Sequence, residues 1–196
     1  VRIKNEKEGF GEDGFDRSQY DLNPIAKLAN YRGFIFGSLV DDVDPIEDYL
    51  GAAATWIDLM VEQSPEGLEV VSGSSTYVIR GNWKMQLENS VDGYHVSTVH
   101  RVFASTVRNR EERESLQGLK QTEGGRLVGI VPSGSYDLGN GHMSIWAQHT
   151  TPERRPIFKK KEWLEENLPA AHVEWILEKG RNLALFPNVM LMDNPS

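Results

Sequence analysis

The stretch NLALFPNVMLM, residues Asn182–Met192, is an apolar run that predicts a buried β-strand. Two earlier runs, RLVGIVP (Arg126–Pro132) and HMSIWAQH (His142–His149), are rich in β-branched, aromatic and other apolar residues and predict two neighbouring strands. The glycine-rich SGSYDLGNG between them predicts the turn that joins them. Strands joined by a short turn pair antiparallel, so these runs indicate an antiparallel sheet.

Further strands are expected towards the N-terminus. LEVVSGSSTYVIRGNW (Leu68–Trp83) alternates between apolar and polar residues and is broken by Gly and Ser, which indicates strands. YRGFIFGSL (Tyr31–Leu39) is short, aromatic and β-branched, and it predicts one strand. The VDDVDP segment that follows (Val40–Pro45) breaks the chain and is the best candidate for a domain boundary.

Two helical regions lie between these strands. Asp44 and Pro45 have the residue types of a helix cap and a first helical position, and apolar residues follow at helical spacing. We expect this stripe to be core: Ile46, Tyr49, Leu50, Ala53, Trp56, Ile57 and Met60. The second region, Lys159–Gly180, is interrupted at Pro169 and ends at Gly180. Helices beside an antiparallel sheet predict an α+β fold.

Composition excludes several classes of protein and site. The net charge is −8, which argues against nucleic-acid binding. No apolar run approaches the roughly 18–20 residues of a membrane span. The sequence contains no cysteine, so disulfides, thiolate zinc sites and cysteine-bound iron–sulfur clusters are excluded within these 196 residues. A cytoplasmic protein fits this composition, and any metal must use His, Asp, Glu or water.

The stretch NSVDGYHVSTVH, residues Asn89–His100, concentrates metal-binding residue types. Asp92 and His95 are three apart and can meet on one helical face. His95 and His100 are five apart, which separates them by about 140° on an ideal helix. They can share one ion only if the helix bends, bulges or ends between them, and Gly93 favours such a distortion.

Two interpretations of this histidine pair stay open from spacing alone. Neutral imidazole binds iron, zinc or copper, and two His with one carboxylate leave open positions on iron(II) for oxygen and an organic substrate. Asp92 is placed to hydrogen-bond a ring N–H, although direct metal binding by it fits the spacing too. Alternatively, His95 and His100 are two unrelated histidines. The other three, His142, His149 and His172, have no motif around them and are expected to be structural or surface residues.

The longer string GNWKMQLENSVDGYHVSTVH (Gly81–His100) resembles the iron-site segment of the large subunit of Rieske non-haem iron aromatic-ring dioxygenases. The resemblance is strongest to the benzoate and anthranilate dioxygenase branch. It rests on Asn-x-x-Asp-x-Tyr-His-x-x-x-x-His, and it continues in order through YRGFIFGSL, DLMVEQSPEGLEV, GSSTYVIRGNWK, NGHMSIW and RNLALFPNVMLMD, which together span most of the chain.

This resemblance assigns roles by position. It implies that His95 and His100 bind a mononuclear iron(II) ion. Asp92 would bridge an iron-bound histidine to a histidine of the Rieske [2Fe-2S] cluster in the neighbouring subunit, on the path of the electron. Asn89 would lie near the iron on the substrate side, and Asn188 would line the substrate pocket from a strand. The implied fold is the family's helix-grip fold, an antiparallel sheet wrapped around helices.

The resemblance also has gaps. The cluster ligands would lie upstream of Val1, so residues 1–40 would be the tail of the Rieske domain and 41–196 a truncated catalytic domain. The carboxylate that completes the iron site is expected downstream of Ser196. Asp193 is not matched to it.

The function implied is that of a terminal oxygenase component. It would use O2 and NADH-derived electrons, delivered by a reductase or ferredoxin, to cis-dihydroxylate an aromatic acid such as benzoate. Assembly as a homotrimer, or as α3β3 with a small β subunit, is implied. The alternatives are a related Rieske monooxygenase or demethylase, a hydrolytic zinc enzyme and a non-catalytic oligomerisation fragment. The i, i+5 histidine spacing counts against the zinc enzyme.

Overall fold

The structure, a computed structural model, describes residues 21–102, 105–106, 132–149 and 151–193. Contacts divide the chain into two compact units, Val1–Ile46 and Glu47–Ser196. None of the helices in the described residues is long and apolar enough to span a membrane. Which domain of the family each unit represents stays a prediction.

The first unit holds an antiparallel hairpin of β1 (Lys27–Tyr31) and β2 (Phe34–Ser38). The single strand predicted for Tyr31–Leu39 is therefore wrong at its start. Arg32 and Gly33 both have positive φ, 54° and 95°, and form a two-residue turn of the kind that suits the twist of a hairpin. An Arg at the first position hides this turn from a sequence search, which looks for Asn-Gly or Asp-Gly.

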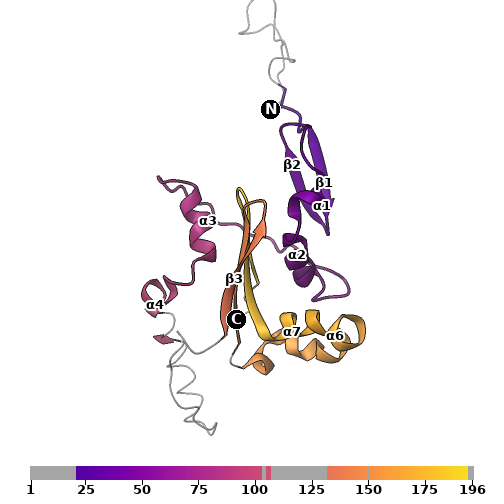
Figure 1. The fold of residues 1–196 in the computed structure, drawn as a ribbon, viewed down its shortest axis with the longest axis vertical. Coiled ribbons are helices and arrows are strands. Elements are labelled where there is room, and N and C mark those ends of the chain that lie inside the picture. The colour runs from indigo at the N-terminus through magenta and orange to yellow at the C-terminus, as the bar shows by residue number, and fades with distance from the viewer. Residues whose placement is uncertain (1–20, 103–104, 107–131, 150, 194–196) are drawn as a thin grey trace, which may run out of the picture. The chain divides into compact units, whose positions relative to one another are not determined.

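The second unit is a four-stranded antiparallel sheet with helices on both faces (Figure 1). The strand order is β3-β4-β5-β6, each strand pairing with its sequence neighbour. α3 packs on one face against β4, β5 and β6, and α2 and α7 contact β5 from the other side (Figure 1). The α+β antiparallel prediction is confirmed. The bounds in chain order are α1 (Ile46–Leu50), α2 (Ala53–Val61), α3 (Lys84–Val91), α4 (Val96–Val99), β3 (Ser133–Gly139), β4 (His142–Gln148), η2 (Pro152–Arg154), η3 (Pro156–Lys160), α6 (Lys161–Asn167), α7 (Ala170–Glu178), β5 (Lys179–Leu185) and β6 (Val189–Asp193).

Two strand predictions in the sheet need correction. SGSYDLG, expected to be a turn, is β3, and the turn shrinks to Asn140 and Gly141, both at positive φ. The run Asn182–Met192 is two strands, because Phe186–Asn188 turns the chain back on itself. Pro187 has no N–H to offer a ladder, so the centre of this run is a poor site for a paired strand. The strand predicted at Arg126–Pro132 lies outside the described residues, apart from Pro132, which is not in a strand.

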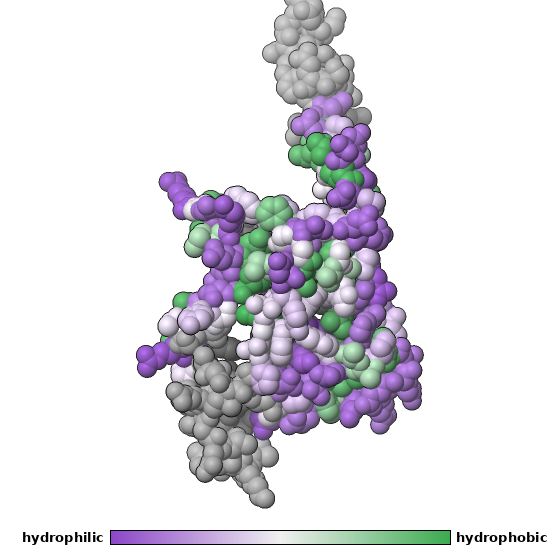
Figure 2. Space-filling model, in the orientation of Figure 1, coloured by the Kyte–Doolittle hydropathy of each residue, from purple (hydrophilic) through white to green (hydrophobic). Residues whose placement is uncertain are grey.

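The strands predicted over Leu68–Trp83 are wrong, because the structure assigns no strand there. Val70, Val78 and Ile79 are each at least 75% exposed. A strand is stable only when its backbone pairs with a neighbour, and no ladder forms with this segment in the described part of the chain. Figure 2 shows hydrophobic residues at the surface of the molecule beside polar ones.

The helices match the sequence prediction more closely. The first begins at Ile46 and, after a break at Gly51 (φ 49°), resumes as α2, with the central stripe buried as expected: Leu50, Ala53, Trp56, Ile57 and Met60. The second region breaks at Pro169 as predicted. It ends at Glu178 rather than Gly180, because Lys179 already pairs with Gln148 in the sheet. A core cluster joins α2 to α6 and α7: Leu59, Leu164, Val173, Ile176 and Leu177.

Candidate metal centre

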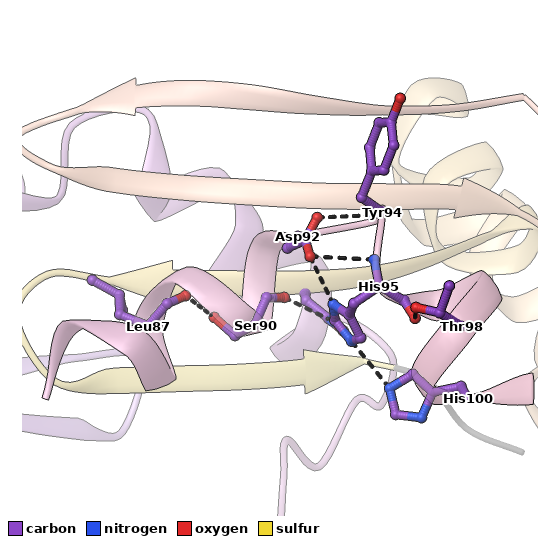
Figure 3. Close-up of polar contacts among 8 residues, drawn as sticks. Leu87, Ser90, Asp92, Tyr94, His95, Thr98 and His100 are labelled. Atoms are coloured by element: carbon purple, nitrogen blue, oxygen red, sulfur yellow. Dashed lines mark hydrogen bonds and ion pairs between the residues drawn. The ribbon is translucent and has the colours of Figure 1, made fainter. Parts of the chain in front are cut away.

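The candidate site is built where α3 ends, at Asp92. This residue is extended (φ −85°, ψ 116°), which stops the helix. Its carboxylate accepts the backbone N–H of Tyr94 at 2.7 Å and that of His95 at 3.2 Å (Figure 3). A carboxylate that binds the N–H groups two and three residues later forms an Asx turn and caps the next helix. The chain therefore changes direction between α3 and α4.

This break brings the two predicted histidines together. His95 precedes α4 and His100 follows it, and their Nε2 atoms lie 3.1 Å apart (Figure 3). The His95 carbonyl accepts the N–H groups of Thr98 and Val99 at 3.0 and 2.7 Å, which closes the short turn. On a continuous helix the two histidines would point about 140° apart. The helix is interrupted here, as the sequence spacing required for the two rings to meet.

Asp92 also fixes the tautomer of His95. Its Oδ2 lies 3.0 Å from His95 Nδ1. The pKa of Asp92 is held below its ordinary value, mainly by the hydrogen bond from the Tyr94 N–H and next by the one from the His95 side chain. The carboxylate is therefore ionised at neutral pH and accepts a hydrogen from Nδ1 of His95. With the hydrogen on Nδ1, the lone pair of His95 Nε2 faces Nε2 of His100, 3.1 Å away. That is the form of imidazole that binds metals.

The pair fits a metal ion. Imidazole nitrogens bind first-row metals at about 2.1 Å, so two of them 3.1 Å apart subtend about 95° at a shared ion. Asp92 contacts Nδ1 on the opposite edge of the His95 ring and is therefore not placed to bind an ion held between the two Nε2 atoms.

The part of the chain that the structure describes offers two candidate ligands at this place, His95 and His100. No group of three or more His, Asp or Glu side chains in the described part of the chain is arranged to hold a metal. Asp193, which the sequence comparison did not match to the iron ligand, is buried and accepts a hydrogen bond from Arg181. The carboxylate expected downstream of Ser196 stays a prediction.

Comparison with known proteins decides the family. Residues 67–195 match the family model of the ring hydroxylating alpha subunit, catalytic domain. This chain belongs to the ring-hydroxylating alpha-subunit family.

Its relatives in this family include the alpha subunit of toluate 1,2-dioxygenase from Pseudomonas putida, 43% identical over 98% of this chain and 42% of the relative. The large subunit of anthranilate 1,2-dioxygenase from Acinetobacter baylyi is 39% identical over 100% of this chain and 43% of that protein. The chain thus spans about two fifths of these relatives. Naphthalene 1,2-dioxygenase from Rhodococcus sp. with bound indole matches in structure, with a TM-score of 0.68, 26% identity and coverage of 98% of this chain and 42% of that one.

The two residues that the family resemblance places on the substrate side, Asn89 and Asn188, belong to other elements than the turn that carries the histidines. Asn89 is on α3 and exposed. Asn188 lies in the exposed turn between β5 and β6, and not on a strand as expected. Trp83 at the start of α3 contacts Phe186 of that turn, with ring centroids 5.8 Å apart. Roles for Asn89 and Asn188 in substrate binding stay predictions.

Sequence reasoning missed the residues that hold this turn. His142 is fully buried, and its Nδ1 accepts the Phe186 N–H at 3.1 Å. Its Nε2 therefore carries the hydrogen and donates to the Tyr49 carbonyl at 2.8 Å, while the Tyr49 hydroxyl donates to the Phe186 carbonyl. The structural role expected for His142 is confirmed. The sequence showed only a histidine in an apolar strand, which did not reveal that its partners are Tyr49 and Phe186.

The remaining two histidines have separate structural contacts. His172 Nδ1 lies 2.7 Å from a carboxylate oxygen of Glu62, which joins α7 to the end of α2. His149 donates its backbone N–H to the Glu178 carbonyl at 2.7 Å. Burial, followed by the nearby Arg155, lowers the pKa of His149, so it is neutral at pH 7. Neither histidine contributes to the candidate metal centre.

Proposed function

We propose that this chain is the iron-binding part of the large subunit of a dioxygenase that adds both atoms of O2 to an aromatic acid. The observation that carries the proposal is the alignment of Asp92, His95 and His100, with two Nε2 atoms 3.1 Å apart and the Asp92 carboxylate on Nδ1 of His95. Relatives named for toluate, 2-halobenzoate and anthranilate support an aromatic carboxylic acid as substrate.

His95 and His100 would hold a mononuclear iron(II), which when bound activates O2 beside the ring. Asp92 would keep the proton on His95 Nδ1 and so keep Nε2 available to the metal. Asn89 and Asn188 would contact the substrate. A third ligand would come from a carboxylate downstream of Ser196. Two neutral imidazoles and one carboxylate leave positions open for other ligands, which oxygen chemistry requires.

The electrons would arrive through Asp92. Its side chain is 39% exposed, against 18% for His95, so the carboxylate is reachable from outside while it touches the histidine. We assign it the bridge to a Rieske [2Fe-2S] cluster of a neighbouring subunit, in a homotrimer or an α3β3 assembly. A cytoplasmic reductase or ferredoxin would supply electrons from NADH. The reaction balances as arene, O2, two electrons and two protons giving a cis-dihydrodiol.

The test is product formation by the complete oxygenase with its reductase, NADH, O2 and benzoate or a methylbenzoate. We expect a cis-dihydrodiol that carries both atoms of 18O2. Product with one labelled atom, or a dealkylated product from an N- or O-methyl substrate only, would instead support the monooxygenase or demethylase alternative. Hydrolysis without O2 consumption, with zinc in the purified protein, would contradict the proposal.

A further inference from the structure

The turn that carries Asp92 and His95 rests on one pair of residues in the sheet. Ile145 of β4 and Asn182 of β5 are directly opposite each other in the ladder, so their side chains share a face. Both reach the α3 side. The Asn182 side-chain N–H donates to the Ser90 carbonyl at 3.1 Å (Figure 3 shows Ser90 beside the site). Ile145 lies under Gly93.

The Asn182 bond falls at a weak point of the helix. α3 ends at Val91, so the Ser90 carbonyl belongs to the last turn, whose carbonyls lack partners within the helix. Ser90 is itself 4% exposed, and its hydroxyl donates to the Leu87 carbonyl at 2.6 Å. A carbonyl in such a position is costly to leave without a partner. Asn182 supplies the partner and ties the helix end to the sheet, two residues before Asp92.

The Gly93 contact sets how closely the turn approaches the sheet. A Cβ at Gly93 would lie 3.0 Å from Cδ1 of Ile145, closer than carbon atoms pack. Gly93 lies between Asp92 and His95, so a backbone shift made to relieve this contact would move the residues on either side, unless the Ile145 side chain turns its Cδ1 away. The absence of a side chain therefore allows the turn to lie directly on Ile145.

We propose that Asn182 and Ile145 are positioning residues for the metal centre: together they fix the end of α3 and the Asp92–His95 turn at the spacing that brings the two histidines together. This rests on the proposed metal site. The two act through the backbone and not by touching the ion.

The first test measures iron(II) affinity of the complete oxygenase after removal of its mononuclear iron, by competition with a chelator. Asn182→Asp replaces the donor by an acceptor facing the Ser90 carbonyl. We expect it to weaken iron binding about 10–100-fold, the usual cost of losing a group that orients a ligand. Asn182→Gln keeps a donor and should recover part of the loss. Met192→Leu, at the cross-strand neighbour of Asn182 on β6, is the matched control and should bind as wild type.

The second test uses the Gly93 contact in a double-mutant cycle. Gly93→Ala should weaken iron(II) binding, and Gly93→Ala with Ile145→Val, which removes the clashing Cδ1, should return affinity to within about twofold of Ile145→Val alone. The cycle stands even where Asn182→Asp fails to fold. The electron spin resonance signal of the nitric oxide adduct should change shape in Gly93→Ala and revert in the double variant.

Thermal unfolding of the iron-free proteins separates positioning from general stability. The inference would be overturned if folded Asn182→Asp bound iron(II) with wild-type affinity and the effects of Gly93→Ala and Ile145→Val on affinity were additive. A lower unfolding temperature in these variants would then show that the residues support only general stability. In that outcome the proposed function survives, provided that wild type binds iron(II) and His95→Ala does not. Failure of wild type to bind iron(II) at His95 and His100 would overturn both.

Discussion

The two faces of the sheet differ in what covers them. On one face, α2, α6 and α7 enclose an apolar cluster in which Leu164 and Ile176 are fully buried. On the other, α3 is held by contacts such as Asn182 to Ser90, and His95 and His100 lie on either side of the short helix α4 that follows it. Burial of apolar area is the main source of folding free energy. Stability therefore lies mainly on the α7 face, whereas the proposed metal site lies on the α3 face, so the two faces should respond to different mutations.

The α7 face also contains buried charge. Arg181 is 1% exposed and donates to Asp193, its cross-strand neighbour on β6. Arg155 is buried too and donates to the carbonyls of Ile176 and Leu177 at 2.7 and 2.8 Å, at the C-terminal end of α7. A cation at that end of a helix satisfies open carbonyls and complements the helix dipole.

The largest effect on stability is expected on the α7 face, at this ion pair. Asp193→Ala leaves Arg181 buried without its carboxylate and should lower the free energy of unfolding by about 3–5 kcal/mol. Urea denaturation measures this. The exposed Lys161–Glu165 pair, 3.6 Å apart, is the control, and Glu165→Ala should cost less than about 0.5 kcal/mol. Equal losses in the two variants would mean that burial does not matter here.

A cavity on the same face should come next. Leu164→Ala removes a fully buried side chain between α2 and α7 and should cost about 2–5 kcal/mol. Iron content per folded molecule should stay at the wild-type level, because the apolar core cluster around Leu164 lies across the sheet from the histidines. Loss of iron from a folded Leu164→Ala protein would show that the two faces are coupled.

On the α3 face, Asp92→Asn should affect iron binding and activity rather than stability. Asn lacks the carboxylate charge, so iron(II) affinity should fall about 10–100-fold without loss of the site, while product formation should nearly stop if Asp92 is the proposed electron bridge. Iron per subunit and single-turnover oxidation of the reduced Rieske cluster, with substrate and O2, measure the two effects. Glu88→Gln on the exposed side of α3 is the control. Normal oxidation of the Rieske cluster in Asp92→Asn would show that Asp92 serves only as a helix cap.

The smallest effect is a pH dependence from His149. Its pKa is below 6.5 in the folded protein, first because of burial and then because of Arg155. The unfolded chain therefore binds the proton first, and the stability this group contributes is present above about pH 6.5 and lost as pH falls towards the folded pKa. Between pH 7 and 5, His149→Asn should lose less unfolding free energy than wild type. Parallel losses in the two proteins would contradict this.

Sequence patterns predicted the helices well and the strands poorly. The stripe from Leu50 to Met60 was found because burial imposes helical periodicity on sequence. The strands at Leu68–Trp83 failed because apolar alternation shows that a segment suits a sheet but not that a partner strand is present. The β5–β6 run was merged into one strand because the apolar residues on both sides outweighed the turn residues Pro187 and Asn188 at its centre.

For the candidate site, the sequence pointed to three residues that the structure brings together, but not to the contacts that support them. Asp92, His95 and His100 stand in one short motif, and their types alone suggest a ligand set. The break after Asp92 could be proposed from Gly93, yet the 3.1 Å approach of the two rings depends on backbone bonds that no side-chain pattern shows. Asn182 lies 87 residues after His95 in the chain, and only the pairing of β4 with β5 and the packing of α3 bring it to the site.

The most direct test of the account is the iron content of His95→Ala and His100→Ala in the complete oxygenase, measured beside the absorbance of the Rieske cluster. If the α3 face is the metal centre, each variant should lose its mononuclear iron and its activity, while cluster absorbance and the urea midpoint stay at wild-type values. Mononuclear iron at full stoichiometry in either variant would contradict the assignment of the two histidines.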